Sequence, residues 1–189
     1  AKVPLILFKF FVFQLSIPLI IDNFVQRGCD VTVYPATTTA EEVLNDDPDL
    51  IFLSNGPGDP DDLDEIVENV KKMIGKKPIV GICLGHQILA RTFGGKTGKL
   101  KFGHRGGNHP VKDFEENKVF ITAQNHGYYV CEVPECMEVT QINLNDNTVE
   151  GMRHKELPIY SVQYHPEACP GPKDSEYVFD KFLEVLNNK

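Results

Sequence analysis

Cys83 stands in a setting where a thiol could do chemistry. It ends the apolar run "PIVGIC", with Gly81 two residues before it and Gly85 two residues after it, and an amphipathic segment follows over residues 84–93. A strand that ends in G-x-C-x-G and leads straight into a helix has the form of a nucleophile elbow, a tight turn that tolerates only small neighbours. Such a turn lifts its side chain above the carboxyl edge of the sheet, where ligands of open α/β sheets bind. Cys83 is therefore a candidate nucleophile, and a buried structural cysteine is the alternative.

The helix predicted after Cys83 would assist such a nucleophile. Its N-terminal amides and the positive end of its dipole point at the sulfur and favour the thiolate, which is the reactive form of cysteine. The backbone N–H of Leu84, the residue after the nucleophile, is placed to hold an oxyanion. The pattern thus predicts a reactive thiol beside an oxyanion site.

His165 is the best candidate for the base that this thiol needs. It follows the strand pattern "PIYSVQY" and lies two residues before Glu167, so an extended backbone would place imidazole and carboxylate on the same face. Pro166 between them favours an extended geometry. The pair would supply the base and the acid that orients it, as in other activated nucleophiles. His86 lies one turn into the helix after the elbow, so we expect it to pack or to fix the turn.

The elements that must position these residues follow an α/β pattern. Short β-branched runs alternate with helical patterns in the first half, which predicts an open, mostly parallel sheet with helices on both faces. Thr39 and Glu42 have the spacing of a capping box, and the predicted helix over 61–77 has acids in its first turn and lysines in its last. Closely spaced strand patterns over 118–165 predict antiparallel hairpins, and an amphipathic helix over 175–187 ends the chain. The predicted strands are "DVTVYP", "DLIFL", "KPIVGIC", "KVFITAQ", "MEVTQINL", "TVEGMRH" and "PIYSVQYH".

Length, charge and cysteine content restrict the class of protein. With 189 residues and 41% hydrophobic content the chain can build one full core, and we expect a single domain over residues 1–189. The formal charge of −8, without a cluster of Lys and Arg, argues against nucleic acid as a partner. The five cysteines are odd in number and form no CxxC pair, which favours a reducing compartment and no structural zinc.

The opening segment, residues 3–21, does not fit the rest of the pattern so readily. It is almost wholly apolar and long enough to suggest a membrane span, but Lys9 and Gln14 interrupt it, as do Pro4 and Pro18. It also lacks the cleavage site of a signal peptide. We predict a buried strand followed by a connection, with a membrane or targeting segment as the alternative.

Three other patterns carry weaker functional signals. The run "GGKTGK" lacks the glycine that a P-loop needs where Ala90 stands, and it follows a helix instead of a strand. The acidic run "DPDDLDEIVE" fits a solvated helix start better than a metal site. His104 and His109 stand in a Gly-rich stretch, but no third ligand has matching spacing, so we expect a structural or partner-facing loop there and no metal.

Several motifs, taken together and in order, carry a family resemblance. They are "SNGPGDP", "GICLGHQ", "FGHRGGNHPV", "ITAQNHG", "VQYHPEA" and the stretch over 165–182. From about residue 23 onward the chain resembles class I (triad) glutamine amidotransferase domains, and specifically the amidotransferase part of the small subunit of carbamoyl phosphate synthetase. The resemblance implies the flavodoxin-like fold of that family, with an open sheet between helices.

The resemblance also implies an activity. Glutamine would be hydrolysed to glutamate and ammonia, with Cys83 attacking the side-chain amide, His165 moving protons and Glu167 orienting the imidazole. Gly58, in the turn before the elbow, would supply the second oxyanion donor beside Leu84. Residues corresponding to the family's substrate contacts are Gly56, Gln87, Asn125, Gly127 and Tyr128. No cofactor is implied; the partner would be a synthetase large subunit or domain that accepts the ammonia, in the cytoplasm or an organelle, for arginine or pyrimidine biosynthesis.

Some alternatives stay open at the level of sequence. The domain could be a docking or regulatory module that keeps the fold without useful catalysis, the amidotransferase of another synthetase, or a relative that hydrolyses other amides, such as a γ-glutamyl hydrolase. The intact Cys83, His165 and Glu167 favour a glutaminase. Tyr128 and Tyr164 stand where the family resemblance leads us to expect Phe, and residues 3–21 do not resemble the family's first strand and helix.

Overall fold

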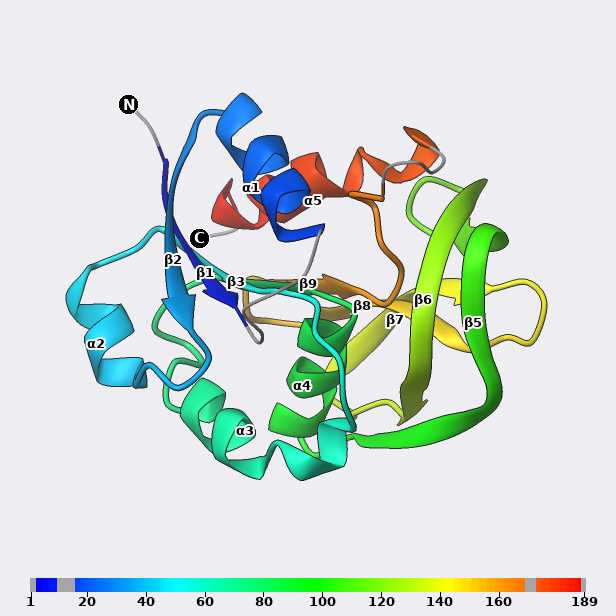
Figure 1. The fold of residues 1–189 in the computed structure, drawn as a ribbon, viewed down its shortest axis with the longest axis horizontal. Helices are drawn as coiled ribbons and strands as arrows, with labels where there is room; N and C mark the ends of the chain where they lie inside the picture. The colour runs from blue at the N-terminus through cyan, green and yellow to red at the C-terminus, as the bar shows by residue number, and fades with distance from the viewer. Residues whose placement is uncertain (1–2, 10–15, 169–172, 188–189) are drawn as a thin grey trace.

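The computed structural model describes residues 3–9, 16–168 and 173–187, and its centre is one mixed β-sheet. Nine strands in this part of the chain pair in the order β2-β1-β3-β4-β9-β8-β7-β5-β6. The first five pair in parallel, and the pairings from β9 through β8, β7 and β5 to β6 are antiparallel. The sheet thus has a parallel half, continued at β9 by an antiparallel half (Figure 1).

The parallel half forms the buried centre of the molecule. Its strands are β1 (Val3–Lys9), β2 (Cys29–Pro35), β3 (Leu50–Leu53), β4 (Ile79–Ile82) and β9 (Ile159–Val162). Every residue of β3, β4 and β9 is buried. Short strands with continuous apolar sequence are typical of parallel sheets that helices cover on both faces, so these runs form strands in the middle of the layer.

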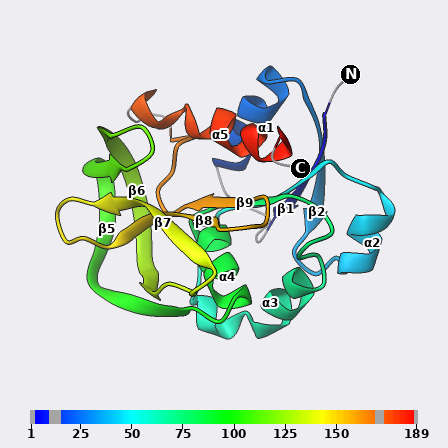
Figure 2. The ribbon, with the colours of Figure 1, turned by 180° about the vertical axis from the view of Figure 1, so that it is seen from behind.

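Helices cover both faces of this half. Figures 1 and 2 show α1 (Ser16–Gln26) and α5 (Val178–Glu184) on one face, with α3 (Asp64–Lys71) and α4 (Leu84–Thr92) on the other and α2 (Ala40–Asn45) towards the β2 edge. Single 3₁₀ turns occupy Pro60–Asp62, Lys173–Ser175 and Val185–Asn187. Thr39 caps α2 with the predicted capping box to Glu42.

Aromatic side chains fill the core between the sheet and the α1/α5 layer. Phe24 of α1 lies 5.1 Å from Phe52 of β3 and 5.2 Å from Phe179 of α5, measured between ring centroids, and both contacts are edge to face. Phe182 packs against the same group. Such pairs add about 0.5–1.5 kcal/mol each beyond their buried area, so they hold α1 and α5 firmly on the sheet.

The antiparallel half is a set of hairpins, as predicted. Its strands are β5 (Lys96–Asp113), β6 (Lys118–Glu132), β7 (Met137–Asn143) and β8 (Val149–His154). β5 and β6 form a long hairpin whose register shifts between Lys99 and His104 and again between Gly106 and His109. The predicted Gly-rich loop is therefore part of a strand; its glycines fall at these irregularities, where Gly103 and Gly106 take positive φ.

The opening segment also differs in part from the prediction. Val3–Lys9 forms strand β1, where a buried strand was predicted. Leu5 and Ile6 are buried, and β1 pairs with β2 on one side and β3 on the other. The connection predicted after this strand was wrong from residue 16 onward, because helix α1 begins at Ser16. The rest of that predicted connection, residues 10–15, lies outside the described residues. The helix predicted over 61–77 is shorter, since only Asp64–Lys71 is α-helical.

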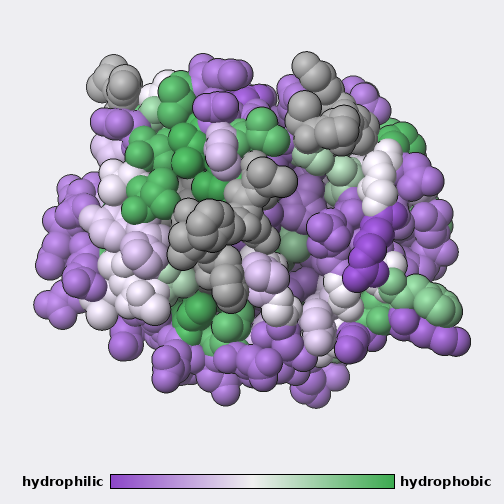
Figure 3. All heavy atoms as spheres, in the orientation of Figure 1, coloured by the Kyte–Doolittle hydropathy of each residue, from purple (hydrophilic) through white to green (hydrophobic). Residues whose placement is uncertain are grey.

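The face of the molecule drawn in Figure 3 is mainly polar. Figure 3 shows hydrophilic residues over most of one face and an apolar group over α1, where Val25 is exposed. In the part of the chain that the structure describes, no helix combines the length and apolar character needed to cross a membrane.

Candidate active site

Cys83 occupies a strained turn at the carboxyl end of β4. Its backbone has φ of 53° and ψ of −102°, a conformation that residues with a Cβ rarely adopt. Its N–H donates to the carbonyl of Val162 in β9 at 2.9 Å, and its own carbonyl accepts the first bond of helix α4 from Gln87 N–H. Such strain persists only where the surroundings enforce it, and it is concentrated at functional sites.

The flanking glycines are required by close packing of backbone against backbone. A Cβ on Gly85 would lie 2.2 Å from the carbonyl oxygen of Leu53, so helix α4 rests directly on strand β3. A Cβ on Gly81 would lie 2.9 Å from the carbonyl carbon of Gly85. Both distances are too short for any other residue, which explains the G-x-C-x-G spacing in physical terms.

His165 and Glu167 come together just after β9, at the same edge of the sheet as Cys83. His165 Nδ1 lies 2.9 Å from Glu167 Oε1, and the Glu167 side chain is fully buried. The expected extended geometry was wrong, because Pro166 and Glu167 form a turn in which Ala168 N–H donates to the His165 carbonyl. A carboxylate oxygen only accepts, so Nδ1 carries the proton and Nε2 is left for other chemistry.

The charge state of His165 is set by these neighbours. Burial by itself lowers the pKa of His165, but the carboxylate of Glu167 and the sulfur of Cys83 outweigh it and raise the pKa well above its ordinary value. Cys83 is thus close enough to interact electrostatically with this imidazole. A cysteine beside a protonated histidine is the arrangement of an activated thiol.

Leu84 and Gly58, the two predicted oxyanion donors, both lie near this edge of the sheet. Leu84 is the first residue of α4, and no side chain caps the helix, since the Cys83 side chain makes no capping bond. Gly58 lies in the turn that follows β3, with φ of 111°. Gly56 lies in the same turn and is half-buried. Because β3 and β4 are adjacent parallel strands, this turn and the elbow lie side by side.

Gln87 ties helix α4 to the antiparallel half. Its Nε2 donates to the carbonyl of Tyr128 at 2.8 Å and to Oε1 of Gln163 at 2.9 Å. Both protons of this amide nitrogen are therefore used inside the protein, and only Oε1 is left to accept a bond from a ligand.

Strand β6 brings the other predicted substrate residues to this region. The carbonyl of Ala123 accepts from His165 N–H at 2.9 Å, so β6 runs directly beside the sheet edge that carries Cys83 and His165. Asn125 is exposed, whereas Gly127 and Tyr128 are half-buried. Tyr128 donates a hydrogen bond to Asp59, which raises the pKa of Tyr128 and joins β6 to the turn after β3.

His86 and His126 are neutral counterparts of His165. His86 is fully buried and its Nδ1 lies 2.9 Å from the Ser161 hydroxyl, so it packs inside as expected. Burial, helped by His126, lowers the pKa of His86 to about 3. Burial likewise lowers the pKa of His126 to about 4. Of these three histidines, His165 alone is placed to hold a proton near neutral pH.

Sequence reasoning missed the polar residues that support this edge. Gln163 accepts from Gln87, and Gln124 lies between His126 and the buried carboxylate of Glu150. The position of Gln163 two residues before His165 is the one local signal, and a single glutamine in a strand is too common to be informative. The contacts of Gln124 and Glu150 join residues 26 apart and have no signature in the sequence.

Comparisons with known proteins identify the family of this chain. The family model for class I glutamine amidotransferases matches residues 16–185. The chain is 70% identical over 165 residues to the carbamoyl phosphate synthase small chain of Clostridium perfringens, covering 87% of this chain and 47% of that protein. The identity to the carbamoyl phosphate synthase small chain of Clostridium acetobutylicum is 57% over 169 residues, covering 88% of this chain and 48% of that protein. The chain thus spans about half the length of these relatives.

The fold has its own counterpart among solved structures. A glutamine amidotransferase from Thermotoga maritima superimposes with a TM-score of 0.73, covering 99% of this chain and 97% of that one at 16% identity. The match to the family model extends from α1 to the end of α5 and includes the elbow, its cysteine and the His–Glu pair. The chain therefore belongs to the class I glutamine amidotransferase family.

Proposed function

We propose that this chain hydrolyses the side-chain amide of glutamine to glutamate and ammonia. The observation that carries the proposal is the strained Cys83 beside a histidine whose pKa is raised by Glu167. A thiol, a proton carrier and an orienting acid at one sheet edge are the parts that acyl transfer through a thioester requires.

The reaction follows from the positions of these groups. The Cys83 sulfur attacks the amide carbon, and the amide oxygen becomes an oxyanion that the N–H groups of Leu84 and Gly58 stabilise. His165 gives its proton to the leaving ammonia, so the C–N bond breaks and a glutamyl thioester remains. His165, now neutral, takes a proton from water, which attacks the thioester and releases glutamate and the thiol. Glu167 holds the imidazole in the required tautomer throughout.

The amino-acid end of glutamine would bind between the turn after β3 and strand β6. We assign it to Gly56, Gln87, Asn125, Gly127 and Tyr128. Gln87 can offer only its Oε1, because its two N–H groups are used by Tyr128 and Gln163, so it is suited to accept from the substrate's ammonium group.

A synthetase is the proposed consumer of the ammonia. The relatives with the highest identities quoted above are named as carbamoyl phosphate synthase small chains. We propose that this chain is the amidotransferase part of such an enzyme and passes ammonia to a large subunit. Because unassisted hydrolysis would waste glutamine, we expect low turnover until the large subunit binds.

A glutamate-release assay tests the function. We expect glutamine-dependent release by the chain, increased by addition of a carbamoyl phosphate synthase large subunit, and reduced at least about 10³-fold in Cys83→Ser. Cys131→Ser, which changes an exposed cysteine on β6, is the control and should act like the wild type. Absence of glutamate release even with the large subunit present would overturn the proposal and favour a docking module.

A further inference from the structure

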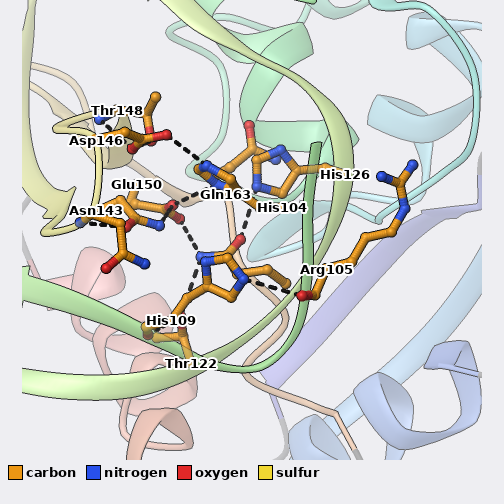
Figure 4. A network of polar contacts seen from close by, with 12 residues as sticks. His104, Arg105, His109, Thr122, His126, Asn143, Asp146, Thr148, Glu150 and Gln163 are labelled. Atoms are coloured by element: carbon orange, nitrogen blue, oxygen red, sulfur yellow. Dashed lines mark hydrogen bonds and ion pairs between the residues drawn. The ribbon is translucent and has the colours of Figure 1, made fainter. Parts of the chain in front are cut away.

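A second cluster of chemically capable side chains lies inside the antiparallel half. His104 of β5, His126 of β6 and Glu150 of β8 are all buried, and one nitrogen or oxygen of each lies within 4.8 Å of the others (Figure 4). The spacing along the chain showed no third ligand for His104 because the partners come from two other strands. We propose that these three residues bind one divalent transition-metal ion, with zinc the best fit.

His104 is oriented as a metal-ligating histidine is. Its Nε2 lies 2.7 Å from Oδ2 of Asp146, and a carboxylate only accepts, so Nε2 carries a proton. Its other nitrogen, Nδ1, is buried without a hydrogen bond among the described residues and lies 3.6 Å from Oε1 of Glu150. A carboxylate behind the far nitrogen is the usual outer partner of a ligating imidazole. Asp146 is itself held by Thr148.

His126 has a contact that a cation would relieve. Its Nδ1 lies 2.7 Å from the carbonyl of Tyr128, so Nδ1 must donate. Its Nε2 lies 2.8 Å from Oε1 of Gln124, which is also an acceptor. Rotating the Gln124 amide by a half-turn to place its nitrogen beside His126 would break the hydrogen bonds that this nitrogen donates to Glu150 and Thr122. When the His126 imidazole is neutral, the lone pair on its Nε2 therefore faces a lone pair on Gln124 Oε1.

Glu150 supplies the negative charge that a metal ion needs. Its carboxylate is completely buried, with Oε1 accepting from Asn143 at 3.0 Å and Oε2 accepting from Gln124 at 2.9 Å. A buried carboxylate is costly unless a positive group compensates it. Two imidazoles and one carboxylate are a frequent ligand set for zinc, which often keeps a fourth position for water. The Gln124 oxygen lies 2.8 Å from His126 Nε2 and would be the fourth donor if no water binds.

The ion would link three strands at one point. Strand β6 continues from His126 to Tyr128, beside the elbow helix, so the site would stabilise the wall on which the proposed glutamine site depends. The binding itself involves no residue of the Cys83, His165 and Glu167 group, so its test is separate from that of glutamine hydrolysis.

Cobalt binding tests the proposal. The full chain, as Cys83→Ser to remove the reactive thiol, is stripped with a chelator and titrated with Co²⁺ while the visible absorption of the bound ion is recorded. We expect one equivalent to bind, zinc to displace it, and Glu150→Gln and His104→Asn each to raise the Kd at least about tenfold. His154→Asn and Glu138→Gln, on half-exposed or exposed positions outside the cluster, are matched controls that should leave the Kd unchanged.

Two outcomes of the cobalt titration would overturn the proposal. Either no bound cobalt, or a Kd that Glu150→Gln leaves unchanged, would show that the cluster is a polar network only. Circular dichroism checks that each variant folds. If Glu150→Gln does not fold, Asp146→Asn replaces it, since that change removes the negative charge beside His104 Nε2 and should weaken binding about tenfold.

Discussion

Around Cys83 the decisive contacts join backbone atoms, whereas around Glu150 they join polar side chains. The elbow is held because Gly85 rests on the Leu53 carbonyl and Gly81 rests on Gly85. The antiparallel half is held inside by hydrogen bonds from Asn143 and Gln124 to one buried carboxylate. The first arrangement fixes a single side chain in a strained position; the second fixes the relative placement of strands.

The two buried carboxylates show the same contrast. Oε1 of Glu167 accepts a hydrogen bond from His165 Nδ1, and Oε2 is buried without a hydrogen bond in the described part of the chain. Each oxygen of Glu150 accepts from a different side-chain amide, that of Asn143 or that of Gln124. A carboxylate dedicated to one imidazole acts mainly on the charge and tautomer of that imidazole, and a shared carboxylate acts mainly on structure.

Glu167→Gln should have the largest effect on activity. The amide keeps the size of the side chain but removes the charge that raises the pKa of His165 and selects its tautomer. We expect glutamine hydrolysis to fall about 10²- to 10⁴-fold, as for loss of a well-placed proton carrier. Glu156→Gln, at an exposed position before β9, is the matched control. Near wild-type turnover in Glu167→Gln would contradict the dedicated role of Glu167.

The same substitution should change the pH dependence of stability. Folding raises the pKa of His165, so the native state binds this proton more tightly than the unfolded chain. The resulting stability is fully present below the unfolded pKa of about 6.5 and is lost as the pH rises through the raised folded pKa. Denaturant unfolding should therefore show a larger deficit for Glu167→Gln at pH 6 than in alkaline solution. A deficit that does not depend on pH would count against the charge pair.

Gly85→Ala should destabilise the fold strongly. The new methyl group would overlap the Leu53 carbonyl, and neither backbone can move without disturbing β3 or α4. We expect a loss of about 3 kcal/mol in the free energy of unfolding. Gly127→Ala on β6 is the matched control, because a Cβ there meets nothing within 4 Å and should change stability by no more than about 0.5 kcal/mol. Equal losses in urea titrations of the two variants would remove the distinction between the halves.

Tyr128→Phe should have the smallest effect. It removes only the hydroxyl that binds Asp59, between strand β6 and the turn after β3. One such hydrogen bond contributes about 1 kcal/mol, so the KM for glutamine should rise about fivefold with kcat little changed. Tyr129→Phe, at the neighbouring position of β6, is the control. A fall in kcat with KM unchanged would place Tyr128 in the chemistry instead of in binding.

The contrast between the halves also explains how much the sequence could predict. Cys83 and its glycines form a local pattern, because strand, turn and helix are consecutive, and His165 with Glu167 are two residues apart. The capping box at Thr39 and the buried runs of β3 and β4 were confirmed for the same reason. The single-domain organisation and the roles of the site residues remain predictions.

The failures lie where contacts are distant along the chain or where strands are irregular. The Gly-rich stretch around His104 and His109 is part of strand β5 and not the predicted loop, because glycines at the register shifts of β5 interrupt the alternation of polar and apolar residues. Helix α1 was missed because its start is as apolar as the strand before it. The meeting of His104, His126 and Glu150 depends on the pairing of three strands, which no short pattern specifies.

Selective labelling of Cys83 tests the central claim most directly. The chain is incubated with a diazo-ketone analogue of glutamine, and the modified residues are identified by mass spectrometry in the wild type and in His165→Ala, with and without glutamine and the synthetase large subunit. We predict that Cys83 is labelled in preference to the other four cysteines, that glutamine protects it, and that His165→Ala slows the reaction. Labelling spread over the exposed Cys131 and other thiols, unaffected by glutamine or by the large subunit, would contradict the account.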